Sequence, residues 1–495
     1  MRPAGLLSET LRFLALSKPA GIATHSPEPG SVWGWQDYWN WRAPELELRV
    51  VHRLDRGTSG VLLLAKGSAA AKDLASLWES GRVRKTYEFA SRAAPREETW
   101  ERKDPIEGKA ARTSFRHLGK RCGFHRYEAV PLTGRTHQIR IHAKLSGCPI
   151  AGDSERGDSR DVWPLLLHAR ALRFECNGRE TAIETPVPAR FEARDPMEAW
   201  WLHACELREM LRPISSAARW LHGAADRFEG VHLERWNDTW AMNLAAENPP
   251  GARWLSEGPL KGKPVVTREY RGSGKVKAPA GSPVEIVEEN GLSYEARFEE
   301  LTTSGLFLDQ RENRLRVARF LEAKPKAKSG TEASLLNLFA HTASFSVVAA
   351  SRGAKTLNVD LSARYLEWGK RHFDRNGLDS TAQGWFRMDA RSWLARAAKR
   401  PERFDAIILD PPSFSRSKEK GAFQVEKELP GLAAAAFGLL KPNGALLVAT
   451  NLQKWPFEAF RAKIQSALRG PAEFSSLPLP PDFPYSGKEG LWMKS

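Results

Sequence analysis

The sequence has few cysteines and no long apolar segment. The four cysteines in 495 residues form no C-x-x-C pair, and they are Cys122, Cys148, Cys176 and Cys205. This pattern excludes a disulfide framework and a structural zinc site, and it is typical of a reducing compartment. No apolar run approaches the ~18 residues that a membrane-spanning helix requires. Because Glu9 and Arg12 interrupt the only apolar stretch near the N-terminus, a signal peptide is not expected. We therefore expect a soluble, cytoplasmic protein that binds no membrane.

An internal repeat and a long low-complexity tract are also absent, which excludes a solenoid. At the usual ~150 residues per domain, the length predicts about three domains. The net charge is +16, from 75 Lys and Arg against 59 Asp and Glu, and residues 81–144 carry 16 basic side chains against 7 acidic ones. This charge favours a polyanionic partner, nucleic acid foremost, over ordinary solvated faces. It does not distinguish RNA from DNA.

Sequence patterns divide the chain into three parts. Residues 1–203 contain many strand-like pieces and few helices, which predicts an α+β unit. Residues 204–300 are expected to hold a linker and a small β-rich domain, because short strands alternate with Gly and Pro turns. Residues 301–495 alternate apolar strands with helices, which predicts a doubly wound α/β domain of the Rossmann type. Its strands are expected at Leu335–Phe339, Thr356–Asp360, Ala406–Asp410 and Ala445–Thr450, after a surface loop at 323–333.

Two polar clusters in the first part, His52–Gly60 and Gly134–His142, are candidates for chemistry. In the second cluster apolar and polar residues alternate, which predicts a strand. Its apolar face would carry Ile139 and Ile141, and its polar face Gln138, Arg140 and His142. An arginine that points from this strand into a cleft would keep the carboxylate of Asp55 ionised, as a nucleophilic aspartate requires.

The residues of both clusters also have interpretations in which they take no part in catalysis. Asp55 is equally compatible with a turn residue that caps Thr58 or Ser59. His137 and His142 have no carboxylate or cysteine at a spacing that would complete a metal site, so no metal is expected. They are better explained as histidines whose hydrogen bonds are made within the fold, or as histidines that face phosphate groups.

Five segments, in matching order and spacing over about 170 residues, resemble the RluA-like pseudouridine synthases. They are LALSKPAGIATHS, HRLDRGTSGVLLLAK, GRVRKTYEF, TGRTHQIRIHAKLSGCPIAGD and LLLHARALRF. The resemblance implies that Asp55 is the catalytic aspartate, which attacks uridine so that the base detaches, rotates and rejoins through carbon. It implies that Arg53 fills the gap left by a flipped nucleotide. It also implies that Tyr87 stacks on and deprotonates the base, and that Arg140 pairs with Asp55.

The last third holds a second group of candidates at the ends of its expected strands. Asp360 ends the second strand, where a doubly wound fold holds a ribose diol, and Asp410-Pro411-Pro412 follows a later strand. Ligands bind at the carboxyl ends of such strands, so these residues are expected to converge on one crevice. Taken singly, a strand-ending aspartate is commonly a helix cap and Pro-Pro a turn. The absence of Gly-x-Gly, with Ala343 where a glycine is expected, disfavours a dinucleotide.

Together these residues resemble the class I S-adenosylmethionine (SAM) methyltransferases, specifically the large-subunit ribosomal RNA group of the RlmI/RlmK type. The matching segments are Thr303–Arg311, Asn337–Ser344, Val359–Ser362, Tyr365–Trp368, Asn376–Leu378, Asp389 and Asp410–Lys418. The resemblance extends from about residue 220 to the C-terminus. It implies that Asp360 holds the ribose of the cofactor and Asp389 its adenine. The other implied cofactor contacts are Arg311, Asn337, Phe339, Thr342, Ser344 and Asp410. The target base would face Pro411, Pro412, Phe414 and Asn451.

No cysteine occurs in residues 206–495. Methylation of a pyrimidine at C5 normally requires a thiolate that adds to C6, and this chain has Ala449–Leu452 where the cytosine-methylating relatives carry their cysteine. Guanine N7 already offers a lone pair and needs positioning more than activation. We therefore expect guanine N7 rather than cytosine as the methylated position.

The leading hypothesis is a bifunctional enzyme that forms pseudouridine and uses SAM to methylate a base in 23S large-subunit ribosomal RNA. In one alternative the methyltransferase is active on guanine or cytosine and the first unit only binds RNA. In another the chain is a non-catalytic ribosome-assembly factor. The sequence predicts neither the oligomeric state nor the nucleotides that are modified.

Overall fold

The structure is a computed structural model that describes residues 3–27, 32–176, 178–245, 249–269, 283–299, 303–324, 332–412, 414–417, 421–450, 456–468, 470–484 and 488–494. The chain divides into two compact units. The first comprises Met1–Pro29, Trp33–Pro213 and Trp220–Gly230, and the second comprises Gly30–Val32, Ile214–Arg219 and Val231–Ser495. Residue 203, the expected end of the first domain, lies inside helix α4 (Pro196–Glu209). The three-part division by residue number therefore stays a prediction.

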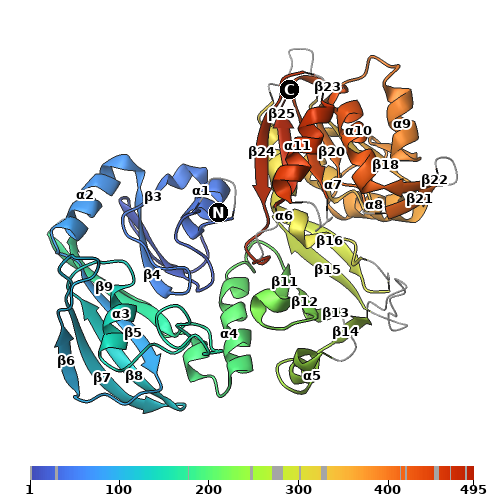
Figure 1. Ribbon diagram of the computed structural model, residues 1–495. Helices are drawn as coiled ribbons and strands as arrows, with labels where there is room; N and C mark the ends of the chain where they lie inside the picture. Colours follow the sequence, from blue (N-terminus) through green and yellow to red (C-terminus); the bar gives the residue numbers. More distant parts are fainter. Residues whose placement is uncertain are drawn as a thin grey trace. The chain divides into compact units, whose positions relative to one another are not determined.

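The first unit is built on one mixed sheet of ten strands (Figure 1). The strand order is β1-β2-β4-β9-β5-β8-β7-β6, with β3 beside β4 and β10 beside β9. The strands are β1 (Leu6–Glu9), β2 (Phe13–Lys18), β3 (Leu48–Val50), β4 (Ser59–Lys66), β5 (Arg84–Ser91), β6 (Thr99–Arg102), β7 (Thr113–Arg121), β8 (Phe124–Pro131), β9 (Leu167–Cys176) and β10 (Arg179–Glu184). The helices are α1 (Trp35–Arg42), α2 (Gly67–Glu79), α3 (Gln138–Leu145) and α4. This architecture confirms the expected α+β class.

The strand predicted within Gly134–His142 is wrong, because Gln138–Leu145 forms helix α3. His137 has a φ of +55°, which turns the chain out of the extended path before the helix begins. The buried residues of α3 are Gln138, Ile139, Arg140, His142 and Ala143. Burial of neighbours one and four positions apart is the pattern of a helix and not of a strand. Five alternating residues were too few to distinguish the two.

The second unit contains one sheet of seven strands, two smaller sheets and a separate two-stranded hairpin between Phe414 and Gln424. The small sheets are β11-β12-β13-β14 and the hairpin β15-β16, and the large sheet has the order β19-β18-β17-β20-β23-β25-β24. The elements of the small sheets are β11 (Ala217–His222), β12 (Val231–Trp236), β13 (Thr239–Leu244), α5 (Pro250–Glu257), β14 (Val265–Glu269), β15 (Val284–Glu289) and β16 (Leu292–Arg297). Helix α5 is not expected from the sequence pattern of this part, which favours short strands.

The large sheet is parallel from β19 to β23, and β25 pairs antiparallel with both β23 and β24. Its elements are α6 (Arg311–Glu322), β17 (Ser334–Leu338), α7 (Ser344–Ala350), β18 (Lys355–Asp360), α8 (Ala363–Arg375), β19 (Gly384–Arg387), α9 (Ala390–Ala397), β20 (Phe404–Leu409), α10 (Val425–Phe437), β23 (Leu440–Ala449), α11 (Phe457–Ala467), β24 (Glu473–Pro478) and β25 (Lys488–Lys494), with the hairpin β21 (Phe414–Ser417) and β22 (Gly421–Gln424). The expected strands and their parallel order are confirmed. Most of the expected loop at 323–333 lies outside the described residues.

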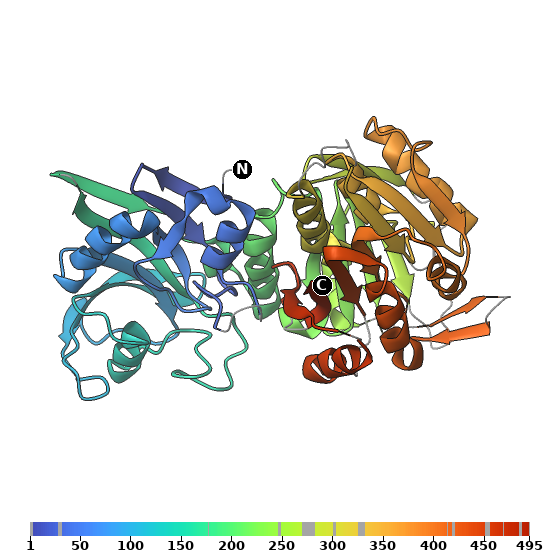
Figure 2. The same cartoon turned by 90° about the horizontal axis from the view of Figure 1, so that it is seen from above.

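Helices cover both faces of the seven-stranded sheet (Figure 2). On one face Leu336 and Leu409 pack with α9, α10 and α11, and on the other Leu335 and Ile408 pack with α6 and α7. Successive residues of a strand point to opposite faces, so β17 and β20 are buried on both sides. This burial explains why both strands carry apolar residues on either face, and it confirms the doubly wound class.

Candidate active sites

Asp55 lies in the loop before β4, and buried groups hold this loop at both ends. Thr24 Oγ1 donates to the carbonyl of Leu54 at 2.9 Å and accepts from the N–H of Leu54 at 3.0 Å. Arg190, whose side chain is fully buried, donates to Ser59 Oγ at 2.9 Å. Because the loop is fixed on either side of Asp55, its carboxylate is held in a defined position.

Gly60 completes the support of this loop, because β4 approaches β9 very closely at this residue. A Cβ on Gly60 would lie 2.1 Å from the carbonyl oxygen of Ala169, and the φ of Gly60 is +125°. Gly60→Ala is expected to lower the free energy of unfolding of the first unit by more than about 1 kcal/mol. Thermal unfolding measures the loss. Gly81→Ala is the control, since Gly81 also has a positive φ (+69°) but a Cβ there meets nothing within 4 Å. Equal losses of unfolding free energy in the two variants would show that the contact between a Cβ at residue 60 and the carbonyl of Ala169 does not destabilise the unit.

Asp55 opens into a cleft of about 480 Å³, which we call the aspartate cleft. Its charged lining residues are Arg53, Asp55, Lys85, Arg135 and Arg140. Four cationic side chains and one carboxylate thus line the cleft, a balance that favours a polyanionic ligand. Arg53 is exposed and Asp55 half-exposed, so both are accessible from solvent.

Arg140 and His137 are the cations nearest to the carboxylate of Asp55. Arg140 Nη1 and His137 Nε2 each lie 3.8 Å from Asp55 Oδ2. The closest partner of Arg140 is Asp153, which accepts from its Nε at 2.8 Å and from its Nη2 at 2.5 Å. Asp153 therefore fixes the plane of the guanidinium, and one remaining nitrogen faces Asp55. The implied pairing of Arg140 with Asp55 stays a prediction, at a distance too long for a hydrogen bond.

Tyr87 and Lys85 line the same cleft from one face of β5. Burial and the nearby charge of Asp55 raise the pKa of Tyr87, so its phenol keeps its proton at neutral pH. A neutral phenol can stack on a base, but it must lose its own proton before it can accept one. Lys85, which sequence reasoning missed, donates to the carbonyl of Thr133 at 3.3 Å, and burial lowers its pKa.

The second unit contains a cavity of about 470 Å³, which we call the acidic cavity. It is lined by Thr303, Phe307, Asp309, Gln310, Phe339, His341, Asp360, Leu361, Ser362, Tyr365, Asp410, Pro411, Pro412 and Thr450. The strands β17, β18 and β20 are neighbours in the sheet, and their carboxyl ends bring Phe339, Asp360 and Asp410 together at the cavity. This is the crevice that the sequence predicted.

The carboxylate of Asp360 is held by backbone donors. It accepts hydrogen bonds from the N–H of His341 at Oδ2 and of Ser362 at Oδ1, each at 2.8 Å. Burial raises its pKa against the effect of these bonds. Phe339, His341 and Ala343 in the loop after β17 all have a positive φ, between +50° and +57°. Such a run of strained non-glycine residues is concentrated at ligand sites.

Five of the predicted residues line the acidic cavity: Phe339, Asp360, Asp410, Pro411 and Pro412. Five others do not line it: Arg311, Asn337, Thr342, Ser344 and Asp389. The side chain of Phe414 and the whole of Asn451 lie outside the described residues. The residues that the sequence analysis did not assign include Asp309, His341 and Tyr365. All three lie within the segments quoted for the resemblance, which was the available signal.

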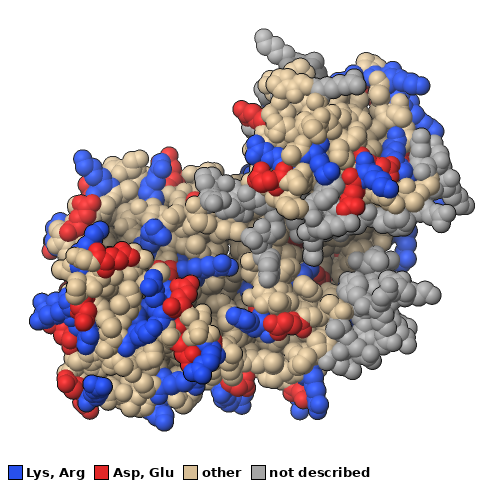
Figure 3. Space-filling model, viewed as in Figure 1, with Lys and Arg blue, Asp and Glu red and all other residues tan. Residues whose placement is uncertain are grey.

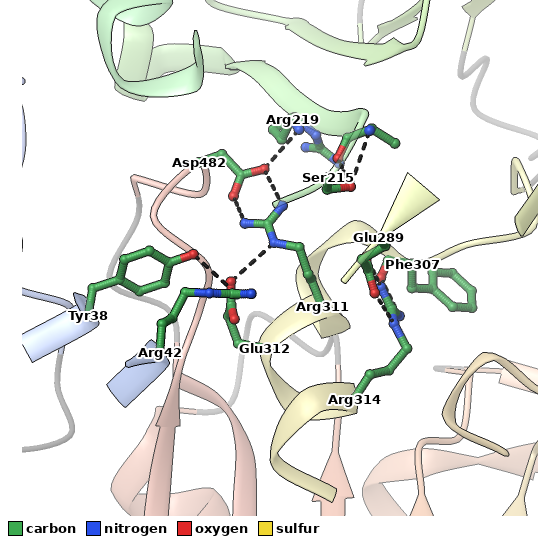
Figure 4. A network of polar contacts seen from close by, with 11 residues as sticks. Tyr38, Arg42, Ser215, Arg219, Glu289, Phe307, Arg311, Glu312, Arg314 and Asp482 are labelled. Atoms are coloured by element: carbon green, nitrogen blue, oxygen red, sulfur yellow. Dashed lines mark hydrogen bonds and ion pairs between the residues drawn. The ribbon is translucent and has the colours of Figure 1, made fainter. Parts of the chain in front are cut away.

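The residues away from the cavity have internal partners. Arg311 is fully buried and donates to Asp482 at 2.5 Å (Figure 4). Asp389 caps α9 and pairs with Arg391 at 2.8 Å. Asn337 donates to Ser346 Oγ at 3.0 Å. Each of these three side chains therefore bonds another residue of the second unit. That they also contact a cofactor stays a prediction.

No group of three or more His, Cys, Asp or Glu in the described parts of the chain is arranged to hold a metal ion. Within the same residues, no helix has both the length and the apolar character needed to cross a membrane.

Comparison with known proteins assigns both units. Residues 12–145 match the family described as RNA pseudouridylate synthase, and residues 254–470 match the S-adenosylmethionine-dependent methyltransferase family. The fold and the two sites thus define a fusion of a pseudouridine synthase domain with a class I SAM-dependent methyltransferase domain of the RlmI/RlmK type. The chain belongs to the family of the ribosomal RNA large subunit methyltransferase K. The protein of that name from Neisseria meningitidis serogroup B is 33% identical over 287 residues, which are 54% of this chain and 73% of the relative.

Other relatives are matched over a smaller part of their length. The "Ribosomal RNA large subunit methyltransferase K/L" of Methylococcus capsulatus is 33% identical over 223 residues, which are 44% of this chain but only 28% of that protein. Among solved structures, a proposed methyltransferase complexed with SAH is 23% identical. It has a TM-score of 0.51 and covers 65% of this chain and 87% of its own. That likeness shows the fold alone.

Proposed function

We propose that this chain is a bifunctional RNA-modifying enzyme of the cytoplasm. The first unit converts uridine to pseudouridine, and the second transfers a methyl group from SAM to guanine N7, both in 23S ribosomal RNA. The observation that carries the proposal is that each unit has a cavity with a suitable carboxylate. Asp55 faces the aspartate cleft beside Arg140, and Asp360 faces the acidic cavity at the end of β18.

The aspartate cleft, and not the charge of the whole surface, is the feature that supports RNA binding. On the face in Figure 3, Lys and Arg side chains lie among Asp and Glu side chains and form no single continuous patch. The cleft instead concentrates four cations around the position of a flipped uridine. In this proposal Asp55 attacks the uridine, Arg53 occupies the gap in the RNA, and Tyr87 stacks on the base.

The acidic cavity suits SAM in size, polarity and charge. Asp360 presents a carboxylate to a ribose diol, and the cavity has aromatic walls at Phe307, Phe339 and Tyr365. SAM supplies the methyl group when bound. Pro411 and Pro412 then face the target base, and no side chain in this unit needs to become a nucleophile. This set of roles follows the family resemblance and remains a proposal.

The test is incubation of the protein with unmodified 23S ribosomal RNA and SAM, followed by mass spectrometry of the digested nucleosides. New 7-methylguanosine together with new pseudouridine is the expected result. A methylated nucleoside without pseudouridine would leave the first unit as an RNA-binding module. No new nucleoside of either kind would favour a non-catalytic assembly factor.

Methylation is expected to survive replacement of each cysteine, because guanine N7 needs no thiolate. Cys122→Ala, Cys148→Ala, Cys176→Ala and Cys205→Ala should each keep the methylation rate within about twofold of the parent. Initial rates with tritiated SAM measure this. Formation of 5-methylcytidine, or loss of methylation in one folded variant, would show that the choice of guanine is wrong.

A further inference from the structure

The acidic cavity has an unusual charge balance. Three carboxylates line it, and none of the lining residues that the structure describes is a lysine or arginine. Asp360 accepts hydrogen bonds from the N–H groups of two other residues, whereas, among the described residues, the only backbone donor that lowers the pKa of Asp309 is its own N–H, and none does so for Asp410. Within the described part of the chain, no side chain donates a hydrogen bond to Asp309 or Asp410 or forms an ion pair with either. These two half-buried carboxylates therefore lack a partner of opposite charge close by.

Asp309 and Asp410 repel each other in this setting. Burial, and then repulsion from Asp309, raise the pKa of Asp410 to about 7, against the attraction of Arg314. Burial also raises the pKa of Asp309, against attraction by Arg219 and Arg314 and a hydrogen bond from its own backbone N–H, and repulsion from Glu234 adds a smaller effect in the raising direction. The pair thus holds a proton part of the time at neutral pH. A cation placed between the carboxylates would replace that proton.

Neither arginine can play the part of such a cation. Arg314 donates to both oxygens of Glu289, at 2.8 and 2.7 Å (Figure 4). Arg219 pairs with Glu234 at 2.9 Å. Their charges are committed to carboxylates outside the cavity, so the cavity itself stays negative.

The rest of the wall also suits a cation. Burial lowers the pKa of His341 to about 3, so its ring is neutral. Its Nε2 is buried and has no hydrogen-bond partner among the described residues. The ring lies 4.3 Å from that of Tyr365 and 4.9 Å from that of Phe307, measured between centroids. Neutral aromatic faces attract cations, and an unsatisfied buried nitrogen indicates a ligand.

We propose that Asp309 and Asp410 select the cofactor by charge, favouring SAM, whose sulfur is a sulfonium cation, over the neutral thioether S-adenosylhomocysteine (SAH). The inference rests on the proposed function, because it requires SAM to bind in the acidic cavity. When the sulfonium enters, the shared proton leaves to solvent. Methyl transfer moves the positive charge to guanine and leaves a neutral sulfur, so the carboxylates regain a proton from solvent and SAH is released.

Calorimetric titrations of SAM and SAH, in two buffers that differ in ionisation enthalpy, test this directly. With the pKa of Asp410 at about 7, SAM binding should release about half a proton at pH 7 and bind about tenfold more tightly at pH 8 than at pH 6. SAH should release fewer protons and depend less on pH. At pH 8 we expect SAM to bind at least about tenfold more tightly than SAH, since one unit of pKa corresponds to a tenfold change.

Two variants and a matched control complete the experiment. Asp410→Asn and Asp309→Asn should each abolish most of the proton release and reduce the preference for SAM over SAH. Glu367→Gln removes the same charge from the exposed face of α8, where Glu367 pairs with Lys370 at 2.7 Å, and should change neither quantity. If Asp410→Asn fails to fold, Asp309→Asn carries the test alone.

SAM binding without proton release, or an unchanged preference in the folded aspartate variants, would overturn the charge selection and leave the cofactor assignment intact. If SAM does not bind the parent protein at all, the cofactor assignment fails and the charge selection fails with it.

Discussion

Asp55→Asn is expected to lower the rate of pseudouridine formation by at least about a thousandfold, the scale of loss when an enzyme loses its nucleophile. The amide retains the shape of the carboxylate but cannot attack uridine. The loop around it is fixed by Thr24 and Arg190, so the fold of the first unit should persist. Release of tritium from 5-tritiated uridine in 23S ribosomal RNA measures the rate.

Two comparisons make this result specific. Asp158→Asn removes the same charge from an exposed position and should leave the rate unchanged. Methylation by Asp55→Asn should equal that of the parent, because Asp55 does not belong to the acidic cavity. If Asp55→Asn retains pseudouridine formation, Asp55 is a turn residue and the chemistry lies elsewhere.

Arg314→Leu is expected to cost the second unit about 3–5 kcal/mol of unfolding free energy. Arg314 and Glu289 form a two-pronged ion pair in which their side chains are 0% and 1% exposed. Arg314 also donates to the carbonyl of Phe307 at 2.8 Å, which ties α6 to the wall of the acidic cavity. Removing the arginine leaves a buried carboxylate without a counter-charge. Chemical denaturation monitored by tryptophan fluorescence measures the loss.

The double variant Arg314→Leu, Glu289→Leu distinguishes the cost of an orphaned charge from the cost of lost packing. It should be more stable than Arg314→Leu alone, since no buried charge remains. Arg253→Leu is the control, because Arg253 pairs with Glu257 on the exposed face of α5 and its loss should hardly change stability. A double variant less stable than the single one would show that packing dominates.

The sheet of the second unit could be predicted because its strands are buried on both faces. Leu335 and Leu336 point to opposite sides of β17 and both meet helices, so apolar residues occupy both faces of this strand. Strands of this kind are visible in a sequence. Ligands bind at the carboxyl ends of parallel strands, and this rule predicts from the sequence that Asp360 and Asp410 lie at one crevice.

Other parts of the sites depend on contacts between distant segments, which local patterns do not contain. Arg311 is a cation in a quoted motif, yet Asp482, 171 residues away, pairs with it inside the unit. Asp309 lies in the turn before α6 and lines the acidic cavity together with Asp410, which follows β20 far along the chain. The pattern of α3 predicts a strand because a charged residue such as Arg140 is expected on the exposed face. In the structure Arg140 is buried, and its counter-charge comes from Asp153, outside the helix.

The strand order of the large sheet has a consequence for synthesis on the ribosome. Strand β24 joins the sheet only through β25, although β25 comes later in the chain. The sheet therefore stays incomplete until residues 488–494 have left the exit tunnel. The ten strands of the sheet in the first unit lie between Leu6 and Glu184, so this sheet can form while the second unit is still being made. We therefore expect the nascent protein to pass through a stage in which Asp55 is already in place while the sheet behind the acidic cavity still lacks β24 and β25.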